Sequence, residues 1–230
     1  MYSRFIIYVA SILILLTFGA VAFADDNASG ITVNGSAEIK AKPDLAYVTF
    51  GVTVESATAV DAAQENARKT SAVIDAIEKF GIPRADIETV GYSVSPVMDY
   101  KTSPPVKVGY SVSNQVQVKI KDLDKVGNLI DVAIAAGANN VQGVNFTIAD
   151  DTAVKQQALV QAIKNAQAKA RVIAEALGVN LGRVTAVSES SGFTPRPLVY
   201  GAAKMEDVTT PIIPGEVEVT ANVTLIYAIQ

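Results

Sequence analysis

Carboxylates are the side chains of this sequence best suited to catalysis, and they occur in two pairs. Asp150 and Asp151 are adjacent, as ligands of a metal ion can be. Glu216 and Glu218 are two residues apart, which places both on one face of a strand and resembles the paired acids of a glycosidase. Adjacent aspartates before a helix more often cap it. We therefore expect Asp150 or Asp151 to cap the following helix, and a carboxylate-dependent hydrolase is a distant alternative.

The other common catalytic groups are missing from the sequence. The chain has no histidine, no cysteine and no tryptophan, which excludes Ser-His-Asp triads, imidazole or thiolate metal sites and disulfides. Ser188, Ser190 and Ser191 lie near Glu189 without a base to activate them. No glycine-rich phosphate-binding motif is present. We predict no catalytic residues, no cofactor site and no metal site, and a protein that is not an enzyme.

The charge balance argues against nucleic acid as a partner. The 230 residues include 19 Lys+Arg and 23 Asp+Glu, for a net charge of −4. Nucleic-acid binding depends on neutralising phosphates with basic side chains. We expect no nucleic-acid partner.

The first 24 residues have the features of a secretory signal peptide. Arg4 precedes an apolar run over residues 5–21, and Ala22-Phe23-Ala24 forms an A-x-A cleavage pattern. If the leader is not cleaved, residues 5–21 are close to the length that spans a bilayer and would tether the protein to the membrane. In both cases residues 25–230 are predicted to be exported, either to the periplasm or to the cell surface.

The elements that must position these residues follow from the periodicity of the exported segment. Apolar and polar residues alternate over 31–41, 46–54, 106–120 and 217–229, and shorter runs at 87–94, 141–148 and 183–188 fit further strands. Helical periodicity covers 60–80, 123–136 and 154–177, with Asp122 as the expected cap of the second helix. The predicted order is ββαββαβαββ. It describes an α+β fold, a mostly antiparallel sheet with three helices packed on one face, as one domain or two subdomains.

The first and third predicted helices each carry a stripe of residues that we expect to face the core. The first helix carries Val60, Ala63, Ala67, Ile74, Ile77 and Phe80. The third helix is mostly alanine on one face, which permits close approach to the sheet: Val154, Ala158, Ala162, Ala166, Ala170, Ile173 and Leu177. A partial echo at an offset of 99 residues, carried by Asn66 and Asn165, leaves an internal duplication open.

A long proline-rich loop over residues 192–215 is too apolar for an ordinary solvated linker. Two interpretations stay open. The loop is a contact arm for another subunit, partner or membrane surface, or it folds over its own sheet. The candidate contact residues are Phe193, Leu198, Val199, Tyr200, Met205, Ile212 and Ile213.

Four N-x-[ST] sequons are also present, which makes them glycan acceptors in a host with that machinery: Asn27, Asn34, Asn145 and Asn222.

Four segments together resemble the SIMPL-domain family of exported bacterial and archaeal envelope proteins. The opening ITVNGSAEIKAKPDLAYVTFGV matches at Gly35, Ala37, Pro43, Asp44, Ala46, Gly51 and Val52. Asn66 and the stretch GIPRADIETVGYSVSPVMDY continue the pattern through Gly81, Ile82, Asp86, Ile87, Thr89, Pro96 and Tyr100. A strand matches at Gly109, Tyr110, Val112, Asn114 and Val118, and a helix at Ala166, Lys169, Ala170, Ile173, Ala174, Leu177 and Gly178.

The resemblance implies an exported α+β protein that forms oligomers and has no established catalytic residues. Its relatives include a periplasmic immunogenic protein and an envelope protein linked to oxidative-stress tolerance. We expect a self-associating, non-catalytic envelope protein, with envelope or oxidative-stress tolerance as its physiological setting. The alternative is a monomeric binding module that grips an apolar ligand or envelope partner through loop 195–214.

Overall fold

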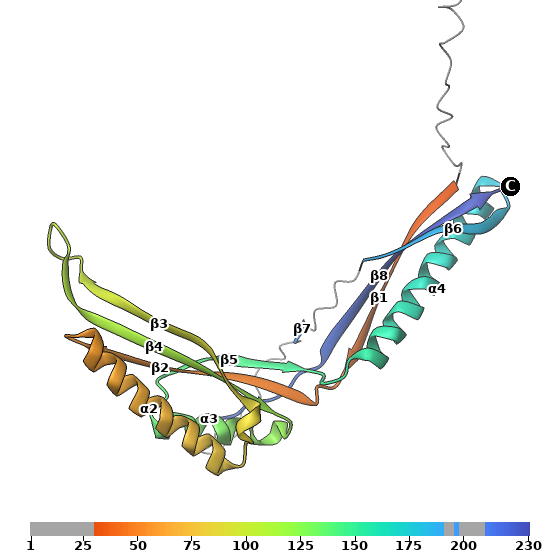
Figure 1. The fold of residues 1–230 in the computed structure, drawn as a ribbon. Helices are drawn as coiled ribbons and strands as arrows, with labels where there is room; N and C mark the ends of the chain where they lie inside the picture. Colours follow the sequence, from red (N-terminus) through yellow and green to blue (C-terminus); the bar gives the residue numbers. More distant parts are fainter. Residues whose placement is uncertain (1–29, 191–195, 198–209) are drawn as a thin grey trace, which may run out of the picture.

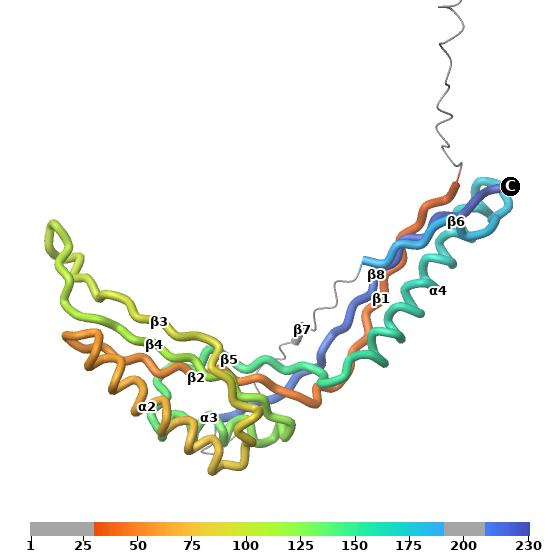
Figure 2. Tube along the Cα trace, in the orientation of Figure 1, coloured from red at the N-terminus to blue at the C-terminus, as the bar shows by residue number. Residues whose placement is uncertain are grey.

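The computed structural model describes residues 30–190, 196–197 and 210–230. Two four-stranded sheets, each covered by helices on one face, form an elongated, bent molecule (Figures 1 and 2). We call the part built from residues 30–41, 152–190 and 217–230 the A half, and residues 45–147 the B half. The helices lie on the outer side of the bend (Figure 1).

The A half joins the two ends of the chain. Strand β1 (Gly30–Ala41) pairs antiparallel with β8 (Val217–Ile229), which pairs with β6 (Leu181–Ser190) and briefly with β7 (Arg196–Pro197). Helix α4 (Thr152–Leu177) lies across β1 and β8. Its buried positions are all alanine, and they bring the helix backbone close to the sheet: Ala158, Ala162, Ala166, Ala170 and Ala174.

Gly35 shows how close this approach is. A Cβ atom at Gly35 would collide with the Ala162 carbonyl oxygen and with Ala166. At this point the alanines of the helix and the glycine of the strand depend on each other, because a Cβ on Gly35 would have no space.

The B half has the sheet order β3-β4-β2-β5, antiparallel throughout. Its strands are β2 (Leu45–Ser56), β3 (Ile87–Asp99), β4 (Val106–Ile120) and β5 (Asn140–Thr147). Helices α2 (Ala59–Phe80) and α3 (Val126–Ala136) cover one face, with short 3-10 turns η1 (Arg84–Asp86) and η2 (Leu123–Lys125). A core of Val, Ile, Leu and Phe side chains fills the space between, including Phe50, Ile77 and Leu129.

The two halves share one topology. In the A half, β1 is followed by α4, β6 and β8, and β8 lies between β1 and β6. In the B half, β2 is followed by α2, β3 and β4, and β4 lies between β2 and β3. The whole B half is inserted between β1 and α4. At the junction the Asp44 carboxylate accepts a hydrogen bond from the Ala149 backbone N–H, 2.7 Å apart.

The helix starts follow capping chemistry. The Thr58 hydroxyl accepts from the Asp61 N–H and so caps α2, and Gly81 ends that helix in the left-handed conformation. At α4 the N-cap residue is Asp151, as predicted for Asp150 or Asp151, but its side chain makes no capping hydrogen bond; the preceding Asp150 carboxylate accepts from the Thr152 N–H at 3.0 Å. Asp122 does not cap a helix through its side chain; its carboxylate pairs with Lys125 instead.

The predicted α+β class, the antiparallel pairing and the order of elements are confirmed, and the strands divide between two sheets. The predicted stripe of the first helix is partly wrong. Val60 is exposed, and two polar residues, Asn66 and Thr70, are buried. The predicted stripe was drawn from apolar residues only, so it missed Asn66, which the helix turns toward the sheet and which hydrogen-bonds there.

Candidate interaction surface

The carboxylates first considered for catalysis lie in structural positions. Asp150 lies just before α4, and hydrogen bonds from the Thr152 hydroxyl and backbone N–H hold the pKa of Asp150 below its ordinary value. Asp151 pairs with Lys155 at 2.8 Å. Glu218 lies opposite Lys40 in the β1–β8 register. Across residues 30–190, 196–197 and 210–230, no three His, Cys, Asp or Glu side chains gather into a potential metal site.

The candidate contact residues of the proline-rich loop fall mostly outside the described residues. Phe193, Leu198, Val199, Tyr200 and Met205 belong to that group. Ile212 packs against the core of the B half, whereas Ile213 is exposed. Just before them, the Thr210 hydroxyl donates to the Asp131 carboxylate at 2.6 Å, and the Thr210 carbonyl lies against Gly127. This end of the loop is therefore fastened to α3 of its own chain.

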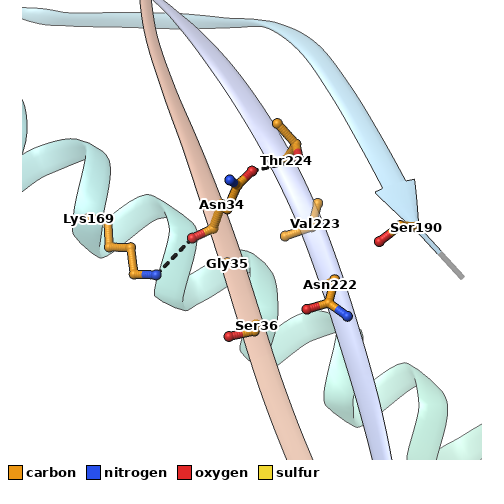
Figure 3. A pocket seen from close by; sticks show the side chains of 8 residues that line it. All are labelled: Asn34, Gly35, Ser36, Lys169, Ser190, Asn222, Val223 and Thr224. Atoms are coloured by element: carbon orange, nitrogen blue, oxygen red, sulfur yellow. Dashed lines mark hydrogen bonds between the residues drawn. The ribbon is translucent and has the colours of Figure 1, made fainter. Parts of the chain in front are cut away.

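Three of the four sequon asparagines are exposed on strands, and Asn27 lies outside the described residues. Asn145 is on β5. Asn34 and Asn222 line a shallow polar pocket of about 350 Å³, together with Ser36, Ser190 and Thr224 (Figure 3). The Asn34 carboxamide oxygen accepts from the Thr224 hydroxyl at 2.8 Å. The pocket floor is a flat sheet of amides and hydroxyls.

Lys169 enters this pocket from α4 and closes the outer edge of β1. Its Nζ donates to the Asn34 carbonyl at 2.9 Å (Figure 3), and the Asn165 carboxamide donates to the Ser36 carbonyl at 2.8 Å. Both carbonyls belong to the edge that β8 does not use. The helix therefore occupies part of the hydrogen-bonding edge that another strand would need.

Exposed apolar residues gather on the β3–β4 hairpin. Of the fifteen large hydrophobic side chains exposed in the described part of the chain, six belong to this hairpin: Val90, Tyr92, Val94, Tyr100, Val106 and Val108. The tip of the hairpin projects beyond the start of α2 (Figure 1). Val106 and Val108 continue the alternating pattern of residues 106–120, but both are exposed.

The position of α2 explains why this surface is uncovered. The helix packs on β2 and β4 and barely touches β3. Val94 lies opposite Val112 in the β3–β4 register, so both side chains are on the helix side of the sheet. Val112 is fully buried, whereas Val94 is 45% exposed and Tyr92 is 57% exposed. We call Tyr92, Val94 and the neighbouring residues 91–97 the β3 edge.

Apart from the two-residue β7, the strands at the edges of the two described sheets are β1, β6, β3 and β5. The β3 edge has the longest regular stretch of open hydrogen-bonding groups among them. β5 is short and bulged opposite Val48 and Phe50, and β6 has two register shifts and carries Arg183 and Glu189. Residues 91–97 of β3 keep an unbroken register with β4, and no charged residue lies between Glu88 and Asp99. Such an edge is a template for pairing with another strand.

The sequence contains a signal for this surface that periodicity did not reveal. The pentapeptide GYSVS occurs at residues 91–95 and again at 109–113. The two copies lie side by side in the hairpin, where Ser93, Val94 and Ser95 face Ser113, Val112 and Ser111. A search for short repeats would have found it.

No helix within the described ranges is both long enough and apolar enough to cross a membrane.

Comparison with known proteins gives a family for this two-sheet α+β architecture. Residues 31–227 match the model of the SIMPL family, which is described as a protein of unknown function (DUF541). The match spans both halves, so the interleaved architecture as a whole corresponds to the family unit. The chain belongs to the SIMPL family.

Two relatives of this chain are informative. The 26 kDa periplasmic immunogenic protein of Brucella melitensis is 31% identical over 237 residues, which cover 96% of this chain and 95% of the relative. The uncharacterized protein YggE of Escherichia coli K12 is 30% identical over 184 residues, which cover 79% of this chain and 75% of the relative. The printed name of the first relative states a periplasmic location for that protein.

Proposed function

We propose that this SIMPL-family protein is an exported, non-catalytic component of the cell envelope that assembles with copies of itself. The leader at residues 1–24 and the periplasmic name of the Brucella relative support export. The observation that carries self-association is the exposed apolar surface of the β3–β4 hairpin, on the helix side of a sheet whose helix stops short of it. Exposed apolar patches of this kind mark protein interfaces.

A non-catalytic role is consistent with the chemistry of the described residues. The two carboxyl groups there with a clearly shifted pKa have a local cause: the pKa of Glu65 is lowered by its hydrogen bond from Arg68, and the pKa of Asp150 by hydrogen bonds from Thr152. Active sites usually hold groups whose pKa is shifted by burial or by like charges. The family resemblance suggests a role in envelope or oxidative-stress tolerance. A strain that lacks this protein should then survive exposure to an oxidant less well than its parent strain.

Light scattering of the purified protein over a range of concentrations tests self-association. We expect a mass that is a multiple of the monomer. The variants Tyr92→Ser and Val108→Ser should reduce that mass, because each removes exposed apolar area from the hairpin. Val172→Ser is the matched control: this valine of α4 is slightly more exposed than Tyr92 and Val108, and its replacement should leave the mass unchanged. A monomer at every concentration would contradict the proposal.

A further inference from the structure

The hydrogen-bonding directions along β3 follow from its neighbours. On the β5 side of β2, the Asn139 backbone N–H donates to the Gly51 carbonyl. The Asn139 carboxamide accepts from the Thr53 N–H and donates to the Thr53 carbonyl, so the backbone groups of Gly51 and Thr53 point toward β5. The backbone groups of Val52 and Val54 must then point toward β4, because directions alternate along a strand. Val54 lies opposite Val112, so the backbone groups of Val112 point to β2.

The same alternation continues through β4 to the β3 edge. Ser111 and Ser113 point toward β3 and bond Ser95 and Ser93, which lie opposite them. The backbone groups of Tyr92 and Val94 therefore point away from β4, to the outer side of the sheet. On that side, within the part of the chain that the structure describes, no strand pairs with β3.

The hairpin itself shows which strand fits this edge. The GYSVS segment of β4 pairs antiparallel with residues 93–97 of β3: Gly109 faces Val97, Tyr110 faces Pro96, and Val112 faces Val94. Since β3 carries the same pentapeptide at residues 91–95, a second copy of β3 offers the same side chains as β4 does. Laid on residues 93–97 in that register, its Val94 would face Val94.

That register is symmetric under a two-fold rotation, because Ser93 then faces Ser95, Tyr92 faces Pro96 and Gly91 faces Val97 in both directions. From this self-complementarity we infer that two protomers of this protein join through their β3 edges, antiparallel, with the two Val94 residues opposite each other on the two-fold axis. The inference rests on the proposed self-association and names its contact. Pairing of identical patches in this way gives a closed, isologous interface.

This pairing gives hydrogen-bond partners to nearly all of the outward backbone groups of residues 92–96 and opposes no like charges. The two Val94 residues exchange both of their N–H and carbonyl groups, and each Tyr92 N–H meets the carbonyl of the opposite Pro96. Pro96 has no N–H, so only the Tyr92 carbonyl stays with water. Glu88 and Asp99 do not face each other or themselves in this register, so no like charges are opposed.

The pairing also brings exposed apolar side chains of the two protomers into contact. A two-fold axis perpendicular to the sheet keeps the helix side of both protomers on the same face. Tyr92 of each protomer then lies beside the opposite Pro96, as Tyr110 lies beside Pro96 within the hairpin. The exposed apolar parts of Tyr92 and Val94 become neighbours in a continuous sheet of eight strands, and cross-strand pairs of this kind stabilise sheets.

Cysteine cross-linking tests the register, since the protein has no native cysteine. Opposed residues of a hydrogen-bonded antiparallel pair have Cα atoms about 5.5 Å apart, within the range that a disulfide bridges. We expect Val94→Cys to yield a dimer on a non-reducing gel after mild oxidation, reversed by reductant. Val187→Cys, on the outer strand β6 and more exposed than Val94, is the matched control and should remain monomeric on the gel.

The outcomes separate this inference from the proposed function. Cross-linking of Val94→Cys alone supports the two-fold pairing. If light scattering shows assembly and Val94→Cys does not cross-link, self-association stands and the β3 pairing is wrong. Cross-linking only when Val94→Cys is mixed with Val187→Cys would replace it with a β3–β6 contact, and equal yields from both single variants would indicate random collision and overturn it. Circular dichroism checks that each variant is folded.

Discussion

The A and B halves use one topology with two different helix contacts. In the A half, α4 presents a buried face of alanines that comes very close to Gly35 of β1, and side chains at its flank donate to carbonyls on the outer edge of β1. In the B half, α2 lies on larger apolar side chains and sends Asn66 into the sheet, while the β3 edge stays open. The placement of the helix over the sheet, more than the strand order, decides which edge is available to a partner.

The contrast between the two asparagines makes this concrete. The Asn66 carboxamide is fully buried and donates to the carbonyls of Val52 on β2 and Val112 on β4, at 2.6 and 3.1 Å. Asn165 is half-buried and donates to an edge carbonyl. One asparagine joins the helix to the middle of its sheet, and the other lies at the border.

The largest effect is expected at the contact between α4 and β1. Gly35→Ala should destabilise the protein by about 3 kcal/mol, because the new Cβ would collide with the Ala162 carbonyl oxygen and the Ala166 backbone. Urea unfolding followed by circular dichroism measures this free energy. Gly91→Ala is the matched control in the B half: its Cβ would meet only the flexible end of Gln115. Equal losses for both variants would mean that the tight A-half contact is not special.

A smaller loss is expected at the buried asparagine of the B half. Asn66→Ala should cost about 2 kcal/mol, since it removes hydrogen bonds to two buried carbonyls. Asn165→Ala, at the border of the A half, should cost far less, because water can replace its exposed hydrogen bond. The same urea experiment compares them, and a larger loss at Asn165 would reverse our comparison of the two helix contacts.

The smallest effect is expected at the start of α4 and depends on pH. Hydrogen bonds from Thr152 lower the pKa of Asp150 in the folded state, so its ionised carboxylate adds stability above the ordinary pKa of an aspartate, and that contribution is lost as pH falls through the lowered value. Asp150→Ala should therefore be less stable than the native protein at pH 7, and the difference should shrink below about pH 4. A thermal-melting difference that stays constant down to pH 2 would contradict this assignment.

Much of this architecture could be predicted because it is local. Period-two runs predicted the strands, the helical periodicity stopped directly before Gly81 and Gly178, where α2 and α4 end, and the alanine stripe of α4 predicted a close helix–sheet contact. The division into two sheets could not be predicted, since the pairing of Gly30 with Ala228 joins the two ends of the described chain. Nor could the open β3 edge, which depends on where α2 lies rather than on β3 itself.

The burial of Asn66 was missed for a related reason. Periodicity arguments place polar residues outside, and the exception becomes visible only when the sheet carbonyls that it bonds are known. The GYSVS repeat differs, because the sequence shows it directly. It was present in the sequence, but its meaning depended on the register between β3 and β4.

The insertion of the B half between β1 and α4 has a consequence for how the protein folds. Residues 45–147 form one continuous segment with its own core, so they can fold before the rest of the chain. β1 precedes this segment, yet its strand partner among the described residues, β8, follows it near the end of the sequence. The earliest strand must therefore wait unpaired for the latest one, and the slow step of folding should be the closure of the A half around a B half that is already complete.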